Sequence, residues 1–370
     1  MPILAISFDG VGDIAYESMA AEAEKYPNIA AFKANGFYRN NVSTVALSST
    51  YPIHATISTG KVPSVHGIIS NYIDATRSDS AAPWAQMASL FKHKTLWDAA
   101  KDKNLKTAAF LWPVSCGGKI DYHIPEYHKQ TGENQVICNL KYGSKFFQLK
   151  TFLKHKHLLD GIKQPNLDNF TTTVACDLLA TKKIDLMLVH LIAYDDFCHN
   201  FGSTGTEPAK KALDENLGRL LNAWGENPVI IFADHSQLDL VEVINLEKLY
   251  PNTFTQNGGS AFIKNAKNLE GKTLESQYWF GRFLTEEEMT ESGHSAYFSA
   301  GITAKVGYSF GEKPMKGEHG YPPSYENYQI FYNTNKKISQ TLKGNIRDVT
   351  AIIANELQLD MDILDEYGWR

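Results

Sequence analysis

The sequence has few cysteines, no long apolar run and no recognisable leader segment. Its four cysteines are scattered over 370 residues without a CxxC pair or zinc-finger spacing, which indicates free thiols in a reducing compartment. No apolar stretch approaches the ~20 residues that cross a bilayer. The N-terminal MPILAISFDG lacks the basic segment and apolar core of a signal peptide. We therefore expect a cytoplasmic protein with no membrane partner.

Excess basic charge is also absent. The chain carries 36 Lys and Arg against 41 Asp and Glu, a net charge of -5, so it lacks the basic surface that a nucleic-acid polymer needs. A charged small-molecule partner would have to be held locally, by a metal ion or by helix ends. Nothing in the composition indicates an oligomeric state.

Short apolar runs recur along the chain, and helical patterns alternate with them. The runs are ILAISFD, KTAAFLWP, IDLMLVHLIAYDD and NPVIIFADHS. Near-continuous apolar strands that alternate with helices predict an α/β protein with a mostly parallel central sheet covered on both faces. We expect one domain over residues 1–370. Residues 114–165 and 238–295 interrupt the pattern, and we interpret both as small insertions that can fold as a cap over the active face.

Candidate metal ligands lie where several of these runs end. Ligands of open α/β sheets bind at the carboxyl ends of the strands, and three runs end in aspartate. Asp195 and His199 are four residues apart, which places them on one face of a helical turn. With Asp9, the adjacent Asp234 and His235, and His319 of GEHGY, they form a nitrogen and oxygen donor set that suits zinc, with manganese as the alternative. The other histidines join no such pattern, and His190 is expected to be a core residue.

The stretch SSTYPIHATISTG, residues 48–60, gathers four hydroxyl side chains and His54. One interpretation is a polar loop that caps a helix. The other is a nucleophile at a helix N-terminus, where unpaired backbone N–H groups attract an anion. The stretch alone favours the first interpretation.

The ordered motifs resemble a known family. Asp9, SSTYPIHATISTGKVPSVHGIISN, DDFCH, ADH and GEHGY, which together span residues 9–321, resemble the alkaline phosphatase superfamily and within it the nucleotide pyrophosphatase/phosphodiesterase branch. The resemblance implies an alkaline-phosphatase-like three-layer fold. Two positions depart from the family pattern: Ser236 stands where the family has a glycine, and Asp13 is an additional acid without an assigned role.

The resemblance also implies roles for individual residues. It implies one zinc ion held by Asp9, Asp234 and His235 with Thr50 facing its fourth position, and a second held by Asp195, His199 and His319. It makes Thr50 the nucleophile and Asn71 a donor to a phosphate oxygen. Tyr51 and Trp112 are expected to line the substrate pocket.

These roles predict a hydrolase of phosphodiester or phosphoanhydride bonds that works through a phosphothreonine intermediate. The substrate would be a small-molecule phosphate ester such as a nucleotide. A phosphomonoesterase and a phosphonoacetate-type C–P hydrolase on the same metal core are the alternatives, and a non-catalytic metal-binding homologue is a further one. A phosphomutase fits the branch least, and a sulfatase is disfavoured because Thr50 stands where that branch has cysteine.

Overall fold

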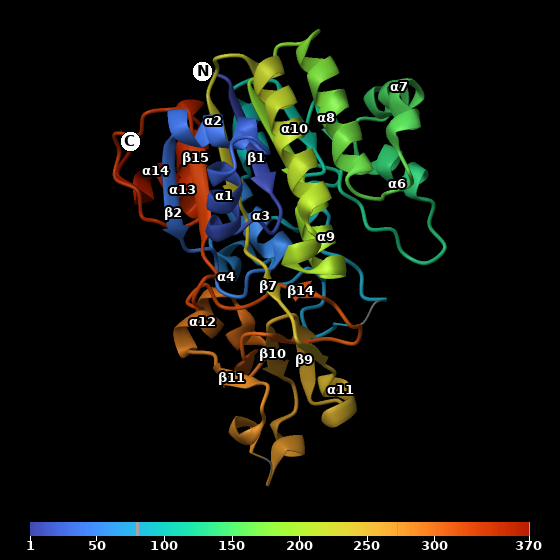
Figure 1. Cartoon of the computed structure of the whole chain (residues 1–370), viewed down its shortest axis with the longest axis vertical. Coiled ribbons are helices and arrows are strands. Elements are labelled where there is room, and N and C mark those ends of the chain that lie inside the picture. Colours follow the sequence, from blue (N-terminus) through green and yellow to red (C-terminus); the bar gives the residue numbers. More distant parts are fainter. Residues whose placement is uncertain (79–80, 272, 370) are drawn as a thin grey trace.

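A seven-stranded sheet forms the centre of the computed structural model, which describes residues 1–78, 81–271 and 273–369 (Figure 1). The strand order is β2-β15-β6-β1-β5-β3-β4. Strands β6, β1, β5, β3 and β4 pair in parallel, and β15 is antiparallel to both of its neighbours. The strands are β1 (Ile3–Phe8), β2 (Phe37–Val42), β3 (Thr107–Phe110), β4 (Tyr122–Ile124), β5 (Leu186–Leu191), β6 (Val229–Ala233) and β15 (Ile330–Thr334).

Helices cover both faces of this sheet. On one face α10 packs against α2, α8 and α9, and α1 packs against α2; on the other, α3 packs against α5 and α13. Because both faces are covered, every residue of β1, β5 and β6 is buried, which explains their near-continuous apolar sequences. The predicted mostly parallel, three-layer fold is confirmed. The helices that cover the sheet, and the short helices α4 and α14 beside them, are α1 (Asp13–Ala21), α2 (Pro27–Asn35), α3 (Thr50–Thr59), α4 (Pro63–His66), α5 (Leu96–Asp102), α8 (Asn166–Leu179), α9 (Ala193–Phe201), α10 (Glu207–Trp224), α13 (Arg347–Glu356) and α14 (Ile363–Glu366).

A second, smaller sheet forms the lower lobe in Figure 1. Its strand order is β11-β12-β10-β9, and it has its own core around buried Trp279, Phe310 and Tyr321. The chain enters and leaves the lobe through the antiparallel pair of β7 (Leu238–Asp239) and β14 (Gly317–Glu318). The lobe contains β8 (Glu242–Ile244), β9 (Phe254–Asn257), β10 (Ser260–Ile263), β11 (Phe280–Phe283), β12 (Gly301–Ala304), β13 (Tyr308–Phe310), α11 (Leu246–Leu249) and α12 (Glu286–Glu291).

The structure moves the boundaries of both predicted insertions. The segment expected at about 238–295 starts with β7 and is followed by β12 and β13 of the same lobe, because β12 pairs with both β10 and β11 and completes their sheet. The stretch 114–165 is only partly an insertion, since β4 lies within it and extends the main sheet beside β3. The rest carries α6 (Gln135–Tyr142) and α7 (Lys145–His155) beyond that sheet edge (Figure 1). None of the helices in the described part of the chain is both long and apolar enough to span a bilayer.

Candidate active site

The strand order brings three expected ligands to one edge of the sheet. Asp9 directly follows β1, Asp234 directly follows its neighbour β6, and Asp195 lies in the first turn of α9, just after β5 on the other side of β1. Gly10, with a φ of +72°, turns the chain between them. Its N–H donates to Asp234 Oδ1 at 3.2 Å, and a Cβ there would lie 3.2 Å from Asp195 Oδ1. A side chain at Gly10 would therefore crowd the site.

Asp9, Asp234 and His235 form the first candidate metal cluster. His235 Nε2 lies 3.2 Å from Asp9 Oδ1 and 3.5 Å from Asp234 Oδ2. The Thr50 hydroxyl lies 3.3 Å from the same nitrogen. The structure thus brings together the three ligands expected for the first metal and the residue expected to face it.

Two carboxylate oxygens of this cluster make no hydrogen bond with the described residues. They are Asp9 Oδ1 and Asp234 Oδ2, and both are buried. Burial, and next the charge of Asp234, raise the pKa of Asp9 well above its usual value. Unpaired buried carboxylates that share a site with an imidazole nitrogen are costly unless a cation offsets their charge. The residues present therefore fit a divalent ion such as zinc.

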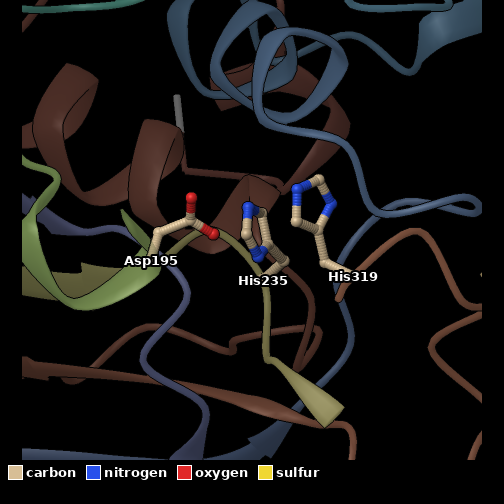
Figure 2. A group of neighbouring side chains, drawn as sticks. All are labelled: Asp195, His235 and His319. Carbon is tan, nitrogen blue, oxygen red and sulfur yellow. The ribbon is translucent and has the colours of Figure 1, made fainter. Parts of the chain in front are cut away.

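The expected ligands of the second metal are divided between two neighbouring groups, each with one further residue. His199 Nε2 lies 3.3 Å from Asp195 Oδ2, and Figure 2 shows Asp195 and His319 on opposite sides of the His235 ring. Asp195 and His319 cluster with His235, whereas His199 clusters with His319 and Glu318. Glu318 was not singled out from the sequence, although it directly precedes His319 in GEHGY.

Hydrogen bonds orient the two histidines of the second group. The Nδ1 atoms of His199 and His319 donate to the carbonyl oxygens of Gly317 at 2.9 Å and Ser48 at 3.0 Å, which leaves each Nε2 available to bind a metal. Burial lowers the pKa of His319 well below its usual value, so that ring is neutral and offers a lone pair. Burial also opposes protonation of His199, but the Asp195 and Glu318 carboxylates outweigh it and raise the pKa.

Thr50 is the first residue of α3, but the helix end offers fewer donors than expected. The Tyr51 N–H donates to Asn71 Oδ1 at 3.0 Å, and Pro52 has no N–H. Asn71 and Pro52 thus remove two of the backbone donors that this helix end could offer an anion. With its Oδ1 engaged, Asn71 keeps its Nδ2 donors unused among the described residues, beside Thr50.

A buried pair of histidines links the nucleophile segment to the first cluster. His54 Nδ1 donates to the Thr50 carbonyl at 2.9 Å, His54 Nε2 lies 3.0 Å from His190 Nδ1, and His190 Nε2 lies 2.8 Å from Asp9 Oδ2. His190 is buried as expected, yet it contacts a ligand. His54 had no assigned role, although its position four residues after Thr50 places both on one face of a helix.

The hydrogen-bond donors and acceptors along Thr50, His54, His190 and Asp9 indicate which ring nitrogens are protonated. The Thr50 carbonyl can only accept, so His54 carries its proton on Nδ1 and accepts on Nε2 when neutral. The Ser7 hydroxyl at 3.1 Å and His190 Nδ1 at 3.0 Å can both donate to that nitrogen; with His190 as the donor, its neutral ring has no proton on Nε2. Its contact with Asp9 therefore holds one shared proton. Burial raises the pKa of Asp9 and lowers that of His190, so it favours the uncharged form of both groups.

The structure corrects the expected pocket wall. Trp112 is fully buried, its indole N–H donates to Ser58 Oγ at 3.0 Å, and its ring packs edge-on against His54 at 4.9 Å. It is a core residue that supports His54, so its assignment to the substrate pocket is wrong. Tyr51 is also buried, with its ring against Trp84 at 5.2 Å.

The aromatic surface next to Tyr51 comes instead from two half-buried residues that were not predicted. Trp84 and His128 stack at a centroid distance of 4.1 Å, and His128 also lies 6.3 Å from the Tyr51 ring. Trp84 lies in a loop and His128 follows β4, where no motif marks either residue.

Both departures from the family pattern have a structural role. Ser236 packs on Gly12, where a Cβ would lie only 2.2 Å from the serine oxygen, so the serine side chain fits because position 12 has no side chain. Asp13 begins α1, and its carboxylate accepts the N–H groups of Ile14 at 2.7 Å and Asn41 at 3.0 Å. It joins that helix to β2 and does not belong to the metal site.

The family follows from comparison with known proteins. Residues 3–292 match the family described as type I phosphodiesterase / nucleotide pyrophosphatase. The chain belongs to this family. Human ectonucleotide pyrophosphatase/phosphodiesterase family member 1 is 30% identical over 118 residues, 31% of this chain and 12% of that protein. The bovine family member 3 is 22% identical over 253 residues, 63% of this chain and 24% of that protein. The chain thus spans a quarter or less of these two relatives.

Solved structures of two kinds of hydrolytic enzyme, as their names describe them, show the same fold. An inactive variant of murine ectonucleotide pyrophosphatase/phosphodiesterase 5 in complex with AMP has a TM-score of 0.65 at 17% identity, with 97% of this chain and 96% of that chain covered. Phosphonoacetate hydrolase from Sinorhizobium meliloti in complex with phosphonoformate has a TM-score of 0.69 at 14% identity, with 96% of each chain covered. At these identities the likeness concerns the fold alone.

Proposed function

We propose that this family member hydrolyses phosphodiester or phosphoanhydride bonds of small-molecule phosphate esters at a two-zinc site, with Thr50 as the nucleophile. One observation carries the proposal: the Thr50 hydroxyl and the unpaired, buried oxygens of Asp9 and Asp234 converge on His235 Nε2. One oxygen of each carboxylate has no hydrogen-bond partner among the described residues, and a hydroxyl placed beside these oxygens is suited to metal-assisted attack.

In this reaction Thr50 Oγ attacks phosphorus while the bond to the leaving oxygen breaks, which gives a phosphothreonine that water then hydrolyses. When bound, zinc would lower the pKa of the hydroxyl and offset charge that develops on phosphate. Asn71 Nδ2 donates to a non-bridging phosphate oxygen. The bond from His54 to the Thr50 carbonyl holds the first turn of α3 in place.

The surroundings favour a diester over the alternatives. Glu126 lies close enough for its charge to raise the pKa values of Asp9 and Tyr51. This negative charge opposes a monoester dianion or the carboxylate of phosphonoacetate more than a singly charged diester. The stacked Trp84 and His128 offer a flat surface for a base or an aryl leaving group.

The cellular setting is part of the proposal. The four cysteines are free, which is typical of proteins from a reducing compartment. On this ground we assign the chain to the cytoplasm. A disulfide that forms in the purified protein without added oxidant would count against this assignment.

Replacement of the nucleophile tests the proposal. Zinc-loaded wild type should turn over bis-nitrophenyl phosphate with a higher kcat/KM than the mono-nitrophenyl ester or phosphonoacetate. Thr50→Ala should keep its metal content and lose turnover by at least about 10³-fold, because the covalent step has no other nucleophile, whereas Thr50→Ser should retain part of it. Mass spectrometry after rapid quenching should find phosphate on Thr50. Substantial turnover by Thr50→Ala would contradict the covalent route, and a preference for phosphonoacetate would establish C–P cleavage instead.

A further inference from the structure

A large, mainly apolar cavity lies between the α6–α7 segment and the edge of the main sheet. Its volume is about 880 Å³, near the upper end of the range for small-molecule sites. Its apolar walls come from the ends of β3 and β4, from both insertion helices and from α8. The main apolar residues are Leu111, Ile124, Leu140, Phe152, Leu167 and Phe170.

Several residues of the cavity wall adjoin residues of the candidate active site. One wall is formed by Ile192 and Asp196, and Asp196 is the immediate neighbour of the expected ligand Asp195. Another wall is formed by Glu126 and His128; Glu126 acts electrostatically on Asp9, and His128 stacks on Trp84. A molecule whose phosphate lies at Thr50 could therefore extend into this cavity.

Apolar side chains also surround the rim. Val136, Leu149 and Ile162 line the cavity and are 49%, 48% and 66% exposed. Such side chains gain free energy when an apolar group covers them, and clustered exposed apolar residues commonly mark a binding site. Polar and charged residues such as Lys156, Gln164 and Asp196 also line the cavity, but most of its wall surface is apolar.

We propose that the cavity binds the apolar chain of an amphiphilic phosphodiester substrate whose phosphate lies at Thr50. This inference rests on the proposed function, because it assigns the substrate class of the same site. An alkyl chain suits a deep cavity with apolar walls better than a nucleobase or sugar does, since their polar atoms would be desolvated with few partners. A protein segment fits less well, since its backbone N–H and C=O groups would also lack partners there.

A homologous series of substrates tests the inference. The probes are the methyl, butyl and octyl esters of 4-nitrophenyl phosphate, in which the bond from Thr50 Oγ to phosphorus forms and 4-nitrophenolate leaves. Each fully buried methylene contributes about fourfold, so the octyl ester should exceed the butyl ester in kcat/KM by at least about tenfold. Equal kcat/KM values across the series would overturn the inference.

Two phenylalanines of α7 provide a matched pair of variants. Phe152 lines the cavity, whereas Phe146 does not and is 91% exposed. Phe152→Ala should reduce the octyl-to-butyl ratio at least about threefold and leave methyl-ester turnover unchanged, and Phe146→Ala should change neither. If Phe152→Ala unfolds, Leu140→Ala serves the same purpose. Equal ratios in a folded cavity variant and wild type would contradict the proposed location.

Direct binding separates this inference from the proposed function. Titration calorimetry of Thr50→Ala with octyl methyl phosphate and with dimethyl phosphate, below any micelle concentration, measures binding without turnover. Tight binding of the octyl compound alone, with no turnover of any ester by wild type, would refute the proposed function but support the cavity assignment. Turnover without chain-length dependence or octyl binding would refute only the cavity assignment.

Discussion

His190 contacts Asp9 of the first candidate metal cluster, and its replacement should weaken metal binding. The fully buried ring contacts Asp9 Oδ2 at 2.8 Å and His54 at 3.0 Å. His190→Leu leaves this carboxylate oxygen without a partner, at a cost of about 1–3 kcal/mol. That is about a fivefold to 150-fold rise in the zinc Kd. Loss of similar outer partners of metal ligands costs about 10–100-fold in other proteins, so we expect a value in that range.

Competition with a chromophoric chelator measures this zinc affinity directly. His190→Gln keeps a polar hydrogen-bonding side chain near Asp9 and should recover part of the loss. His66 is an equally buried histidine outside the site, bonded to Thr56, and His66→Leu is the matched control that should leave the zinc Kd unchanged. If folded His190→Leu binds zinc within twofold of wild type, or no more weakly than His66→Leu, the orienting role of His190 is refuted.

Two further predictions concern a buried acid and the aromatic residues. Burial raises the pKa of Asp168 from 3.8 to about 7, although its carboxylate accepts the Ala193 N–H at 2.8 Å. The folded chain thus keeps a proton that the unfolded chain releases, so this group lowers the free energy of unfolding as pH rises from about 4 to 7. Asp168→Asn should flatten that slope in urea unfolding of the metal-free protein, and an unchanged slope would contradict the assignment. Trp84→Ala should reduce kcat/KM for nitrophenyl diesters about threefold to tenfold and largely keep the stability of the fold. Trp112→Ala should instead cost about 3–5 kcal/mol of stability. The reverse pattern in paired kinetic and thermal measurements would refute the assignment of Trp84, in place of Trp112, to the substrate pocket.

The main sheet and the strand ends could be predicted because local patterns determine them. Strands buried on both faces need apolar residues at nearly every position, and β1, β5 and β6 show this directly. A polar residue directly after such a strand must lie at the sheet edge, so Asp9 and Asp234 were predictable. The boundary of the smaller lobe could not be predicted from the sequence, because β12 joins β10 and β11 through long-range antiparallel pairing that leaves no local signal near residue 295.

The supporting residues of the site were harder to predict. His190 lies in an apolar strand, where sequence cannot distinguish a core histidine from one that hydrogen-bonds a ligand. Trp112 follows a strand just as a pocket residue would, but its indole N–H turns inward to Ser58. Trp84 and Glu126 approach the site only through the folding of segments far apart in the chain.

Anomalous diffraction at the zinc absorption edge, from crystals of the zinc-loaded chain, tests the two-metal site most directly. We predict one peak about 2.0–2.2 Å from Asp9 Oδ1, Asp234 Oδ2 and His235 Nε2, on the side of Thr50. A second peak should lie near Asp195 and the Nε2 atoms of His199 and His319. Zinc-loaded crystals without a peak between Asp9, Asp234 and His235 would contradict the metal site and the reaction proposed from it.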